Sequence, residues 1–239
     1  IIGQDYSFGQ VVSDTSIELL KQKRPDIEIV GNEFHPIGQV KDFTPYVTKI
    51  VSSGADAVIT GNFGADMVSL ARSIIDSGLD IPIYTFYAAY DGITATLGEG
   101  GKDRIRLIHN GVANPLPSEE RKQFNRDFKA ENPNFDVTQP RILNALQMVV
   151  TAMEQTQSTD PYDIAVALED MRFTTIGGEE IWMRGDDHQI FQSLSISVHT
   201  DEDIEFDADN SGWGLRTEYQ VPKEDTIVES SCQMRPPRR

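Results

Sequence analysis

The stretch that most constrains the fold lies at residues 57–75, where a strand, a glycine-bounded turn and a helix follow one another directly. Residues 57–60 form an apolar run, and the turn Gly-Asn-Phe-Gly-Ala-Asp occupies residues 61–66. Apolar residues then recur at helical spacing, as Met67, Leu70, Ala71, Ile74 and Ile75. In a parallel α/β sheet such a turn lies at the carboxyl end of a strand, the edge where ligands bind.

The same alternation of short apolar runs and amphipathic helices extends over the first 110 residues. Helices are predicted at residues 8–22, 42–54, 65–77 and 92–97. Strands are predicted at residues 1–2, 27–30, 55–60, 81–85 and 104–108. Because only a few residues connect these elements, the pattern predicts an α/β fold with a doubly wound parallel sheet. Periodicity does not reveal the order of the strands.

The pattern changes near residue 110. Three helices are predicted at 119–129, 140–155 and 162–171, followed by a strand at 190–198. The middle helix carries an apolar stripe too broad for a surface helix, so it must pack against something large. This stripe consists of Ile142, Leu143, Ala145, Leu146, Val149, Val150 and Met153. The sequence shows no sheet for these helices, which predicts a missing partner lobe.

We therefore expect three parts in the chain. Residues 1–110 form an α/β lobe, and residues 111–200 supply helices and a strand of a partner lobe, with crossings near 110 and 200. Residues 201–239 form a return segment and a flexible tail. The chain opens on Ile1 and Ile2, which look like the tail of a buried strand, without an initiator Met or a signal peptide. We accordingly expect a product that begins inside a domain.

Charge and composition exclude several classes of protein. A formal net charge of -17 argues against a nucleic-acid surface, which needs clustered Lys and Arg. No apolar stretch approaches the roughly 18 residues of a membrane span, and a mean hydropathy of -0.37 is typical of a soluble globular chain. The only cysteine, Cys232, excludes an internal disulfide and a cysteine-rich metal site.

The residues that could perform catalysis have simpler structural roles. Asp5, Asp66 and Asp91 precede or begin predicted helices, where a carboxylate caps backbone N–H groups. The histidines lack zinc-ligand spacing, and we interpret residues 184–189, which include His188, as a hydrogen-bonded turn. No nucleophile elbow, Walker A motif or dinucleotide fingerprint is present. We expect neither an enzyme nor a bound metal or cofactor.

Aromatic residues occupy three of the strand-to-helix turns. They are Tyr6 and Phe8 in the first turn, Phe63 in the second, and Phe86, Tyr87 and Tyr90 in the third. Aromatic side chains are more often core than ligand contacts, but clustering at the functional edge of a sheet favours a ligand-binding wall. Backbone N–H groups at the helix starts could also meet an anionic group of the ligand.

Four segments together resemble a known family. They are residues 4–9 with the helix that follows, residues 42–58, residues 71–79, and residues 184–189. Over roughly residues 3–200 the chain is similar to the leucine/isoleucine/valine-binding type of ABC-transporter solute-binding protein. The resemblance implies the type I periplasmic-binding-protein fold, with one lobe nearly complete, the other partial, and the N-terminal segment lacking. It implies a periplasmic location, a membrane permease as partner, and no insertion into the membrane.

The resemblance also assigns ligand contacts to positions in this chain. The aromatic residue after the first crossing matches Phe8, and the contact on the glycine turn falls at Phe63 or Gly64. The acidic residue that receives a ligand ammonium in amino-acid-binding members falls at Tyr87, with Phe86 and Tyr90 as neighbouring alternatives. An ammonium buried without a counter-charge is costly, so we expect a carboxylate ligand without an α-amino group, an aromatic acid before an aliphatic one.

Three alternatives remain open at this point. The same fold could bind a branched-chain amino acid, or it could serve as a ligand-sensing receptor domain. The third alternative is a small α/β enzyme that uses Asp66 or His188.

Overall fold

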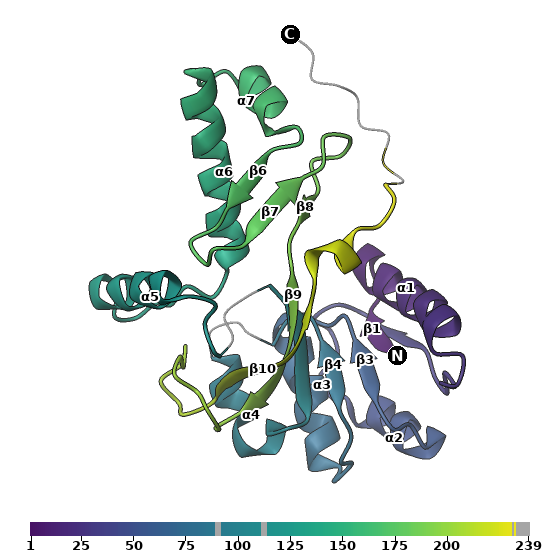
Figure 1. The fold of residues 1–239 in the computed structure, drawn as a ribbon. Coiled ribbons are helices and arrows are strands. Elements are labelled where there is room, and N and C mark those ends of the chain that lie inside the picture. Colours follow the sequence, from purple (N-terminus) through teal and green to yellow (C-terminus); the bar gives the residue numbers. More distant parts are fainter. Residues whose placement is uncertain (89–91, 111–113, 231, 233–239) are drawn as a thin grey trace. The chain divides into compact units, whose positions relative to one another are not determined.

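The computed structural model describes residues 1–88, 92–110, 114–230 and 232. The chain divides into two compact units (Figure 1). Unit 1 comprises Ile1–His109 and Ile196–Glu218, and unit 2 comprises Asn110–Ser195 and Tyr219–Arg239. Each unit has its own sheet, helices and buried residues, as described below.

The described residues of the main sheet form seven strands in the order β10-β9-β5-β4-β3-β1-β2. These are β1 (Ile2–Gln4), β2 (Glu33–His35), β3 (Val58–Thr60), β4 (Ile83–Thr85), β5 (Ile105–His109), β9 (Leu194–Thr200) and β10 (Gly214–Val221). Strand β1 pairs in parallel with both β2 and β3, and β3, β4 and β5 continue the parallel run. Because the strand order reverses at β1, the sheet is doubly wound, as predicted.

Four helices connect the parallel strands of unit 1: α1 (Ser7–Lys23), α2 (Thr44–Ser53), α3 (Gly64–Asp76) and α4 (Ile93–Gly101). Right-handed crossovers assign α1 to one face of the sheet and α2, α3 and α4 to the other. Helix α3 contacts both α2 and α4, as this assignment requires. The helix predicted at 42–54 ends at Gly54, which has left-handed φ and ψ angles and so closes the last turn.

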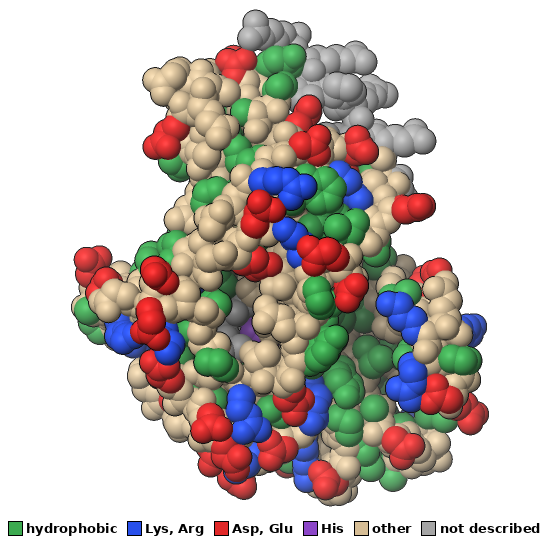
Figure 2. Space-filling model, viewed as in Figure 1, with side chains coloured by type: hydrophobic (Ala, Val, Ile, Leu, Met, Phe, Trp, Pro, Cys, Tyr) green, Lys and Arg blue, Asp and Glu red, His purple; other side chains and the backbone are tan. Residues whose placement is uncertain are grey.

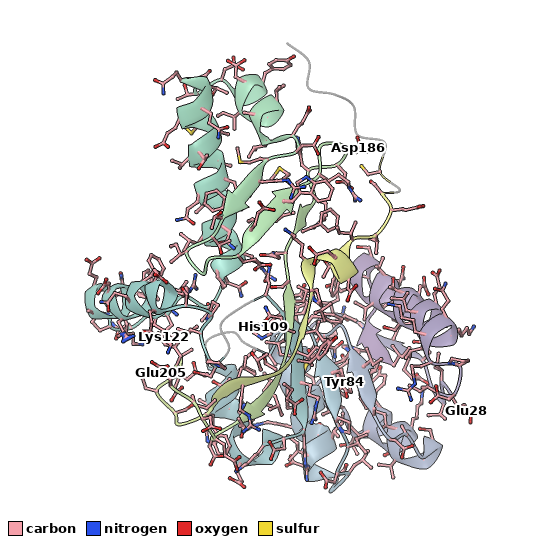
Figure 3. The ribbon with its side chains drawn as sticks, in the orientation of Figure 1. Glu28, Tyr84, His109, Lys122, Asp186 and Glu205 are labelled. Carbon is pink, nitrogen blue, oxygen red and sulfur yellow. The ribbon has the colours of Figure 1, made fainter. Side chains whose placement is uncertain are left out.

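Burial alternates along the central strands. In β4 the side chains of Ile83 and Thr85 are fully buried, whereas Tyr84 between them is only half-buried. The half-buried side chains of Ile59 and Tyr84 pair across β3 and β4 and border a groove of about 500 Å³. Figure 3 labels Tyr84 on the sheet, and Figure 2 shows hydrophobic side chains gathered beside it. One face of the sheet is therefore less fully covered than the other.

One predicted strand is wrong. Residues 27–30 alternate in polarity but form no strand, and Ile27 and Val30 are exposed. The partner of β1 is instead β2, where Glu33 pairs with Ile2 and His35 pairs with Gln4. Alternation describes which residues could share a face, but hydrogen bonding to a neighbour decides which residues become a strand.

The described residues of unit 2 form three helices and a small sheet of their own. The helices are α5 (Glu119–Glu131), α6 (Pro140–Thr156) and α7 (Pro161–Leu168), and a 3₁₀ turn η1 lies at Lys223–Thr226. The antiparallel sheet consists of β6 (Arg172–Thr174), β7 (Glu180–Met183) and β8 (Ile190–Phe191). The expectation that these helices lack a sheet is therefore wrong. The strand predicted at 190–198 is divided into β8 and β9.

The hydrophobic core cluster of unit 2 packs against one side of α6. Met148 and Ala152 of α6 pack with Met171, Ile181 and Met183, and α7 adds partly buried residues to the same cluster. Neither of these α6 residues belongs to the apolar stripe predicted for the helix, and none of the seven stripe residues is fully buried. Ile142, Leu146 and Val150 are each more than half exposed. The side of α6 that packs in unit 2 is therefore not the one that the apolar stripe predicted.

The visible surface carries acidic side chains over both units, with Lys and Arg scattered among them (Figure 2). This distribution agrees with the formal charge of -17. None of the helices in the described part of the chain combines the length and apolarity that crossing a bilayer requires.

Candidate ligand-binding site

The sheet brings the three aromatic turns together because of its strand order. The turns follow β1, β3 and β4, which lie next to one another in the sheet and run in the same direction. Their carboxyl ends therefore meet at one edge. Five aromatic side chains from these turns form a group that we call the ring cluster: Tyr6, Phe8, Phe63, Phe86 and Tyr87.

Four members of the ring cluster form a closed circuit of contacts. The ring of Tyr6 lies 5.9 Å from that of Phe63, which lies 5.9 Å from that of Tyr87. The circuit continues from Tyr87 to Phe8 at 5.6 Å and closes from Phe8 to Tyr6 at 6.2 Å. Phe86 packs edge-on against Phe8 at 6.2 Å. These centroid distances lie within the range of favourable aromatic pairs, so each ring orients its neighbours.

The rings of the ring cluster are partly accessible to solvent. Phe63 is 38% exposed, and the other four rings are partly exposed. Burial raises the pKa of the Tyr6 hydroxyl above 10.0, and the nearby Tyr87 raises it further, so Tyr6 stays a neutral hydrogen-bond donor at physiological pH. The cluster can therefore offer an apolar surface with a phenol hydroxyl to a small molecule.

Gly64 follows Phe63 and begins α3. Its φ angle of 61° lies in the left-handed region, where glycine is favoured, so this turn depends on the residue type. Tyr90, the seventh predicted contact, lies outside the described residues. The ring cluster brings together five of the seven predicted positions, with Gly64 next to Phe63. Their role as ligand contacts stays a prediction.

A buried polar network lies beneath the turn that bears Phe63. Gln4 at the end of β1 is 1% exposed, and Asp66 in the first turn of α3 is 4% exposed. The side-chain amide of Gln4 donates to Asp66 Oδ2 over 2.7 Å, and the same oxygen accepts from the backbone N–H of Gly38 over 2.8 Å. Sequence reasoning did not assign a role to Gln4. The sequence feature that could have revealed this role is a polar residue at the end of a strand, directly before an aromatic turn.

Two histidines are also buried at carboxyl ends of strands in unit 1. His35, at the end of β2, faces Asn62 across 3.1 Å through Nε2. His109 ends β5, and its Nε2 lies 3.0 Å from the hydroxyl of Ser197. Both rings are thus held by polar side chains of a neighbouring strand or turn. Polar groups buried in this way are normally satisfied by hydrogen bonds.

The capping role predicted for Asp66 and Asp5 is wrong. Helix α3 has Phe63 at its N-cap without a side-chain hydrogen bond, and Asp66 instead accepts from Gln4 and Gly38. Helix α1 likewise has no side-chain cap, and Asp5 accepts from the amide of Gln10. The partners of Asp66 are distant in the sequence, whereas Gln10, the partner of Asp5, belongs to α1 itself. Asp91 lies outside the described residues.

The polar turn at residues 184–189, in unit 2, is hydrogen-bonded as predicted. Arg184 donates through its Nε to Asp187 over 2.9 Å, and the backbone N–H of His188 donates to the carbonyl of Arg184 over 2.9 Å. Among the described residues, no group of three or more His, Cys, Asp or Glu side chains could hold a metal ion. The turn is a structural feature of unit 2.

Comparison with known proteins places this geometry in a family. A family model described as periplasmic binding protein matches residues 1–200. Leu/Ile/Val-binding protein homolog 4 of Brucella abortus (strain 2308) is 26% identical over 244 residues, which cover 99% of this chain and 57% of the relative. The chain therefore spans a little over half the length of the curated relatives that it matches.

Solved structures share the fold. The leucine-, isoleucine-, valine-, threonine- and alanine-binding protein of Brucella ovis, in its closed conformation, superposes with a TM-score of 0.88 at 24% identity. That match covers 99% of this chain and 61% of the other. A solute-binding protein of Rhodopseudomonas palustris HaA2 in complex with p-hydroxybenzoic acid has a TM-score of 0.72 at 17% identity, over 93% and 60% of the two chains. The fold is the type I periplasmic binding fold, partial relative to these proteins, and this chain belongs to the periplasmic binding protein family.

Proposed function

We propose that this protein is the periplasmic solute-binding component of an ABC importer, which delivers a small carboxylate to a permease in the inner membrane. The observation that carries the proposal is the ring cluster at the ligand-binding edge of the parallel sheet. The ligand-binding lobe that we propose is built on residues 1–110. Because the chain spans 57% of its curated relative, the activity of the whole protein is part of the proposal.

The chemistry of the ring cluster favours an aromatic acid. Tyr87, which the resemblance aligns with an ammonium-binding acid, contacts Phe8 and Phe63 and supplies a phenol where an amino-acid binder would carry a carboxylate. Burying an ammonium there without a counter-charge would cost on the order of several kcal/mol. An aromatic acid instead matches the rings by stacking and edge contacts. The solved Rhodopseudomonas palustris complex with p-hydroxybenzoic acid supports this ligand class.

The test is calorimetry on the 239-residue chain with two matched sets of ligands. The first set is benzoate and 4-hydroxybenzoate, and the second is leucine and valine. We expect heat of binding with the first set only. Binding of leucine or valine without a response to the benzoates would overturn the proposed ligand class.

The variant Tyr87→Glu sharpens this test because it restores the counter-charge at the aligned position. We expect it to weaken benzoate binding through like-charge repulsion and to favour ligands that carry an ammonium. The matched control Tyr87→Gln has nearly the same shape as Tyr87→Glu but no charge. If both variants change benzoate affinity equally, charge at residue 87 does not select the ligand.

Branched-chain amino acid binding is the second candidate function. It is favoured by the name of the curated Brucella abortus relative and by the 0.88 TM-score of the Brucella ovis amino-acid-binding protein. The two candidates differ in the ligand ammonium, which the same calorimetric panel measures.

A further inference from the structure

Gln4 occupies a position from which it can hold three parts of the candidate site at once. Its backbone carbonyl accepts from the N–H of Tyr6 over 2.9 Å, which orients the turn that bears the first rings. Its side chain crosses to the turn after β3. There Oε1 accepts from the N–H of Phe63 and Nε2 donates to the carbonyl of Phe63, each over 3.4 Å. One buried side chain thus contacts both backbone polar groups of a cluster residue.

Helix α1 holds Gln4 from the other side. Gly9 lies so close to the backbone of Gln4 that a Cβ atom on Gly9 would overlap the carbonyl oxygen of Gln4. Phe8 immediately precedes this contact, so the position of its ring depends on the same close approach. Gln4 is therefore in contact with the backbone segments that carry Tyr6, Phe8 and Phe63.

The carboxylate of Asp66 anchors the amide of Gln4. The 2.7 Å bond to Asp66 Oδ2 is the shortest that the Gln4 side chain makes, whereas its two contacts with Phe63 are long for hydrogen bonds. Asp66 Oδ2 also accepts from the N–H of Gly38, in the loop after β2. Because a hydrogen bond to a charged acceptor is stronger than one between neutral groups, this oxygen fixes the orientation of the amide.

We propose that Gln4 and Asp66 are positioning residues that preorganise the ring cluster for its ligand. This inference rests on the proposed function, since it assigns the two residues to the same site. Neither side chain needs to touch the ligand. They hold the Phe63 turn in one conformation before binding, which removes the entropy cost of ordering it when the ligand arrives.

The first experiment requires no ligand, so it is independent of the proposed function. Amide hydrogen exchange is measured on the 239-residue chain and on Gln4→Leu, which keeps the bulk of the side chain and removes its polar atoms. We expect the amides of residues 61–66 to exchange about tenfold faster, which corresponds to losing hydrogen bonds of about 1.4 kcal/mol in total. The amides of β5 serve as the internal control and should be unchanged. Unchanged exchange at residues 61–66 would overturn the proposal, as would an equal increase at β5.

A charge exchange tests the link between the two residues. Gln4→Glu places a second carboxylate beside Asp66, and we expect faster exchange of the Phe63 and Gly38 amides. Adding Asp66→Asn restores an amide–carboxylate pair in the opposite order, and we expect it to reverse much of this increase. If each substitution only disturbed its own surroundings, the increases in amide exchange would add in the double variant instead of cancelling.

The second experiment adds 4-hydroxybenzoate as the probe. We expect Gln4→Leu to bind it about tenfold more weakly than the unsubstituted chain, with the loss in association entropy. If the unsubstituted chain binds no benzoate, the proposed ligand class fails while the exchange result still decides the positioning role. If Gln4→Leu loosens residues 61–66 but binds with unchanged affinity, the positioning role for the ligand is overturned.

Discussion

Helices α3 and α6 are both strongly amphipathic, yet the protein buries them to different degrees. In α3 the apolar residues Met67, Leu70 and Ile74 are at most 1% exposed, because the helix packs on the sheet between α2 and α4. In α6 the buried side is narrow, and Leu146 is 59% exposed. Apolar spacing therefore identifies residues that could be buried, but the elements available to cover a helix decide which of its sides is buried and how fully.

The largest expected effect tests this difference directly, with the same substitution on each helix. Leu70→Ala should lower the free energy of unfolding by about 2–5 kcal/mol, since it leaves a cavity in a fully packed site. Leu146→Ala should change it by less than about 0.5 kcal/mol, because that side chain already lies in solvent. Trp213 lies in unit 1 and Trp182 in unit 2, so variants that keep only one of the two give a separate fluorescence signal for each unit in urea titrations. A large loss with Leu146→Ala would show that α6 is covered in solution.

The next effect concerns how tightly α1 approaches β1 in unit 1. Gly9→Ala should destabilise the chain by about 1–3 kcal/mol, because the added methyl overlaps the carbonyl of Gln4. Gly31→Ala is the matched control, since a Cβ there meets nothing within 4 Å. This control should be neutral, or stabilising by up to about 1 kcal/mol through the unfolded state. Thermal denaturation distinguishes the two, and equal effects would contradict the close packing of α1.

A third prediction compares an aromatic group in each unit. Phe8→Ala removes a ring that contacts three others of the ring cluster, and we expect affinity for 4-hydroxybenzoate to fall about tenfold. Phe128→Ala removes one ring of the Phe124–Phe128 pair on α5, and we expect no change in affinity. Calorimetry on both variants measures this difference. A loss of binding with Phe128→Ala would show that unit 2 contributes to the site.

The smallest expected effect is a difference between the two units in how their stability depends on pH. His199 in unit 1 is fully buried, donates through Nε2 to the carbonyl of Gly98 over 2.8 Å, and stacks on Trp213. Burial lowers the pKa of His199 below 6.5, although Asp103 and Asp201 oppose the shift. The unfolded chain therefore takes up the proton first as the pH falls. The free energy of unfolding should keep its full value above pH 6.5. Below that pH it should fall, by at most about 1.4 kcal/mol per pH unit.

Unit 2 should respond at a lower pH. The side chain of Arg184 holds the pKa of Asp187 well below its ordinary value of 3.8, so this stabilisation is present above pH 3.8 and lost as the pH falls further. Trp213 fluorescence should report loss of stability below pH 6.5, and Trp182 fluorescence only in stronger acid. His199→Gln should remove the first transition and leave the second unchanged. If the first transition persists in His199→Gln, a group other than His199 causes it.

Much of unit 1 was predictable because its local signals agree with one another. Apolar runs, glycine stops and short connections each predicted the same alternation, and the structure has helices and parallel strands at nearly all of those positions. The exception at residues 27–30 shows the limit of local reasoning, since that segment is amphipathic but lacks a hydrogen-bonding neighbour. The contacts of Asp66 could not be predicted, because its partners, Gln4 and Gly38, are 62 and 28 residues away in the chain.

By itself, the sequence determined the fold class and the set of aromatic turns. Both depend on periodicity and on residue types within short windows, which require no knowledge of contacts between distant segments. Only the tertiary structure decided that β1, β3 and β4 are neighbours, so that Tyr6, Phe63 and Tyr87 share one cluster. The hydrogen bonds of Gln4 with Asp66 and Phe63 likewise depend on the tertiary structure, because they join residues about 60 positions apart in the chain.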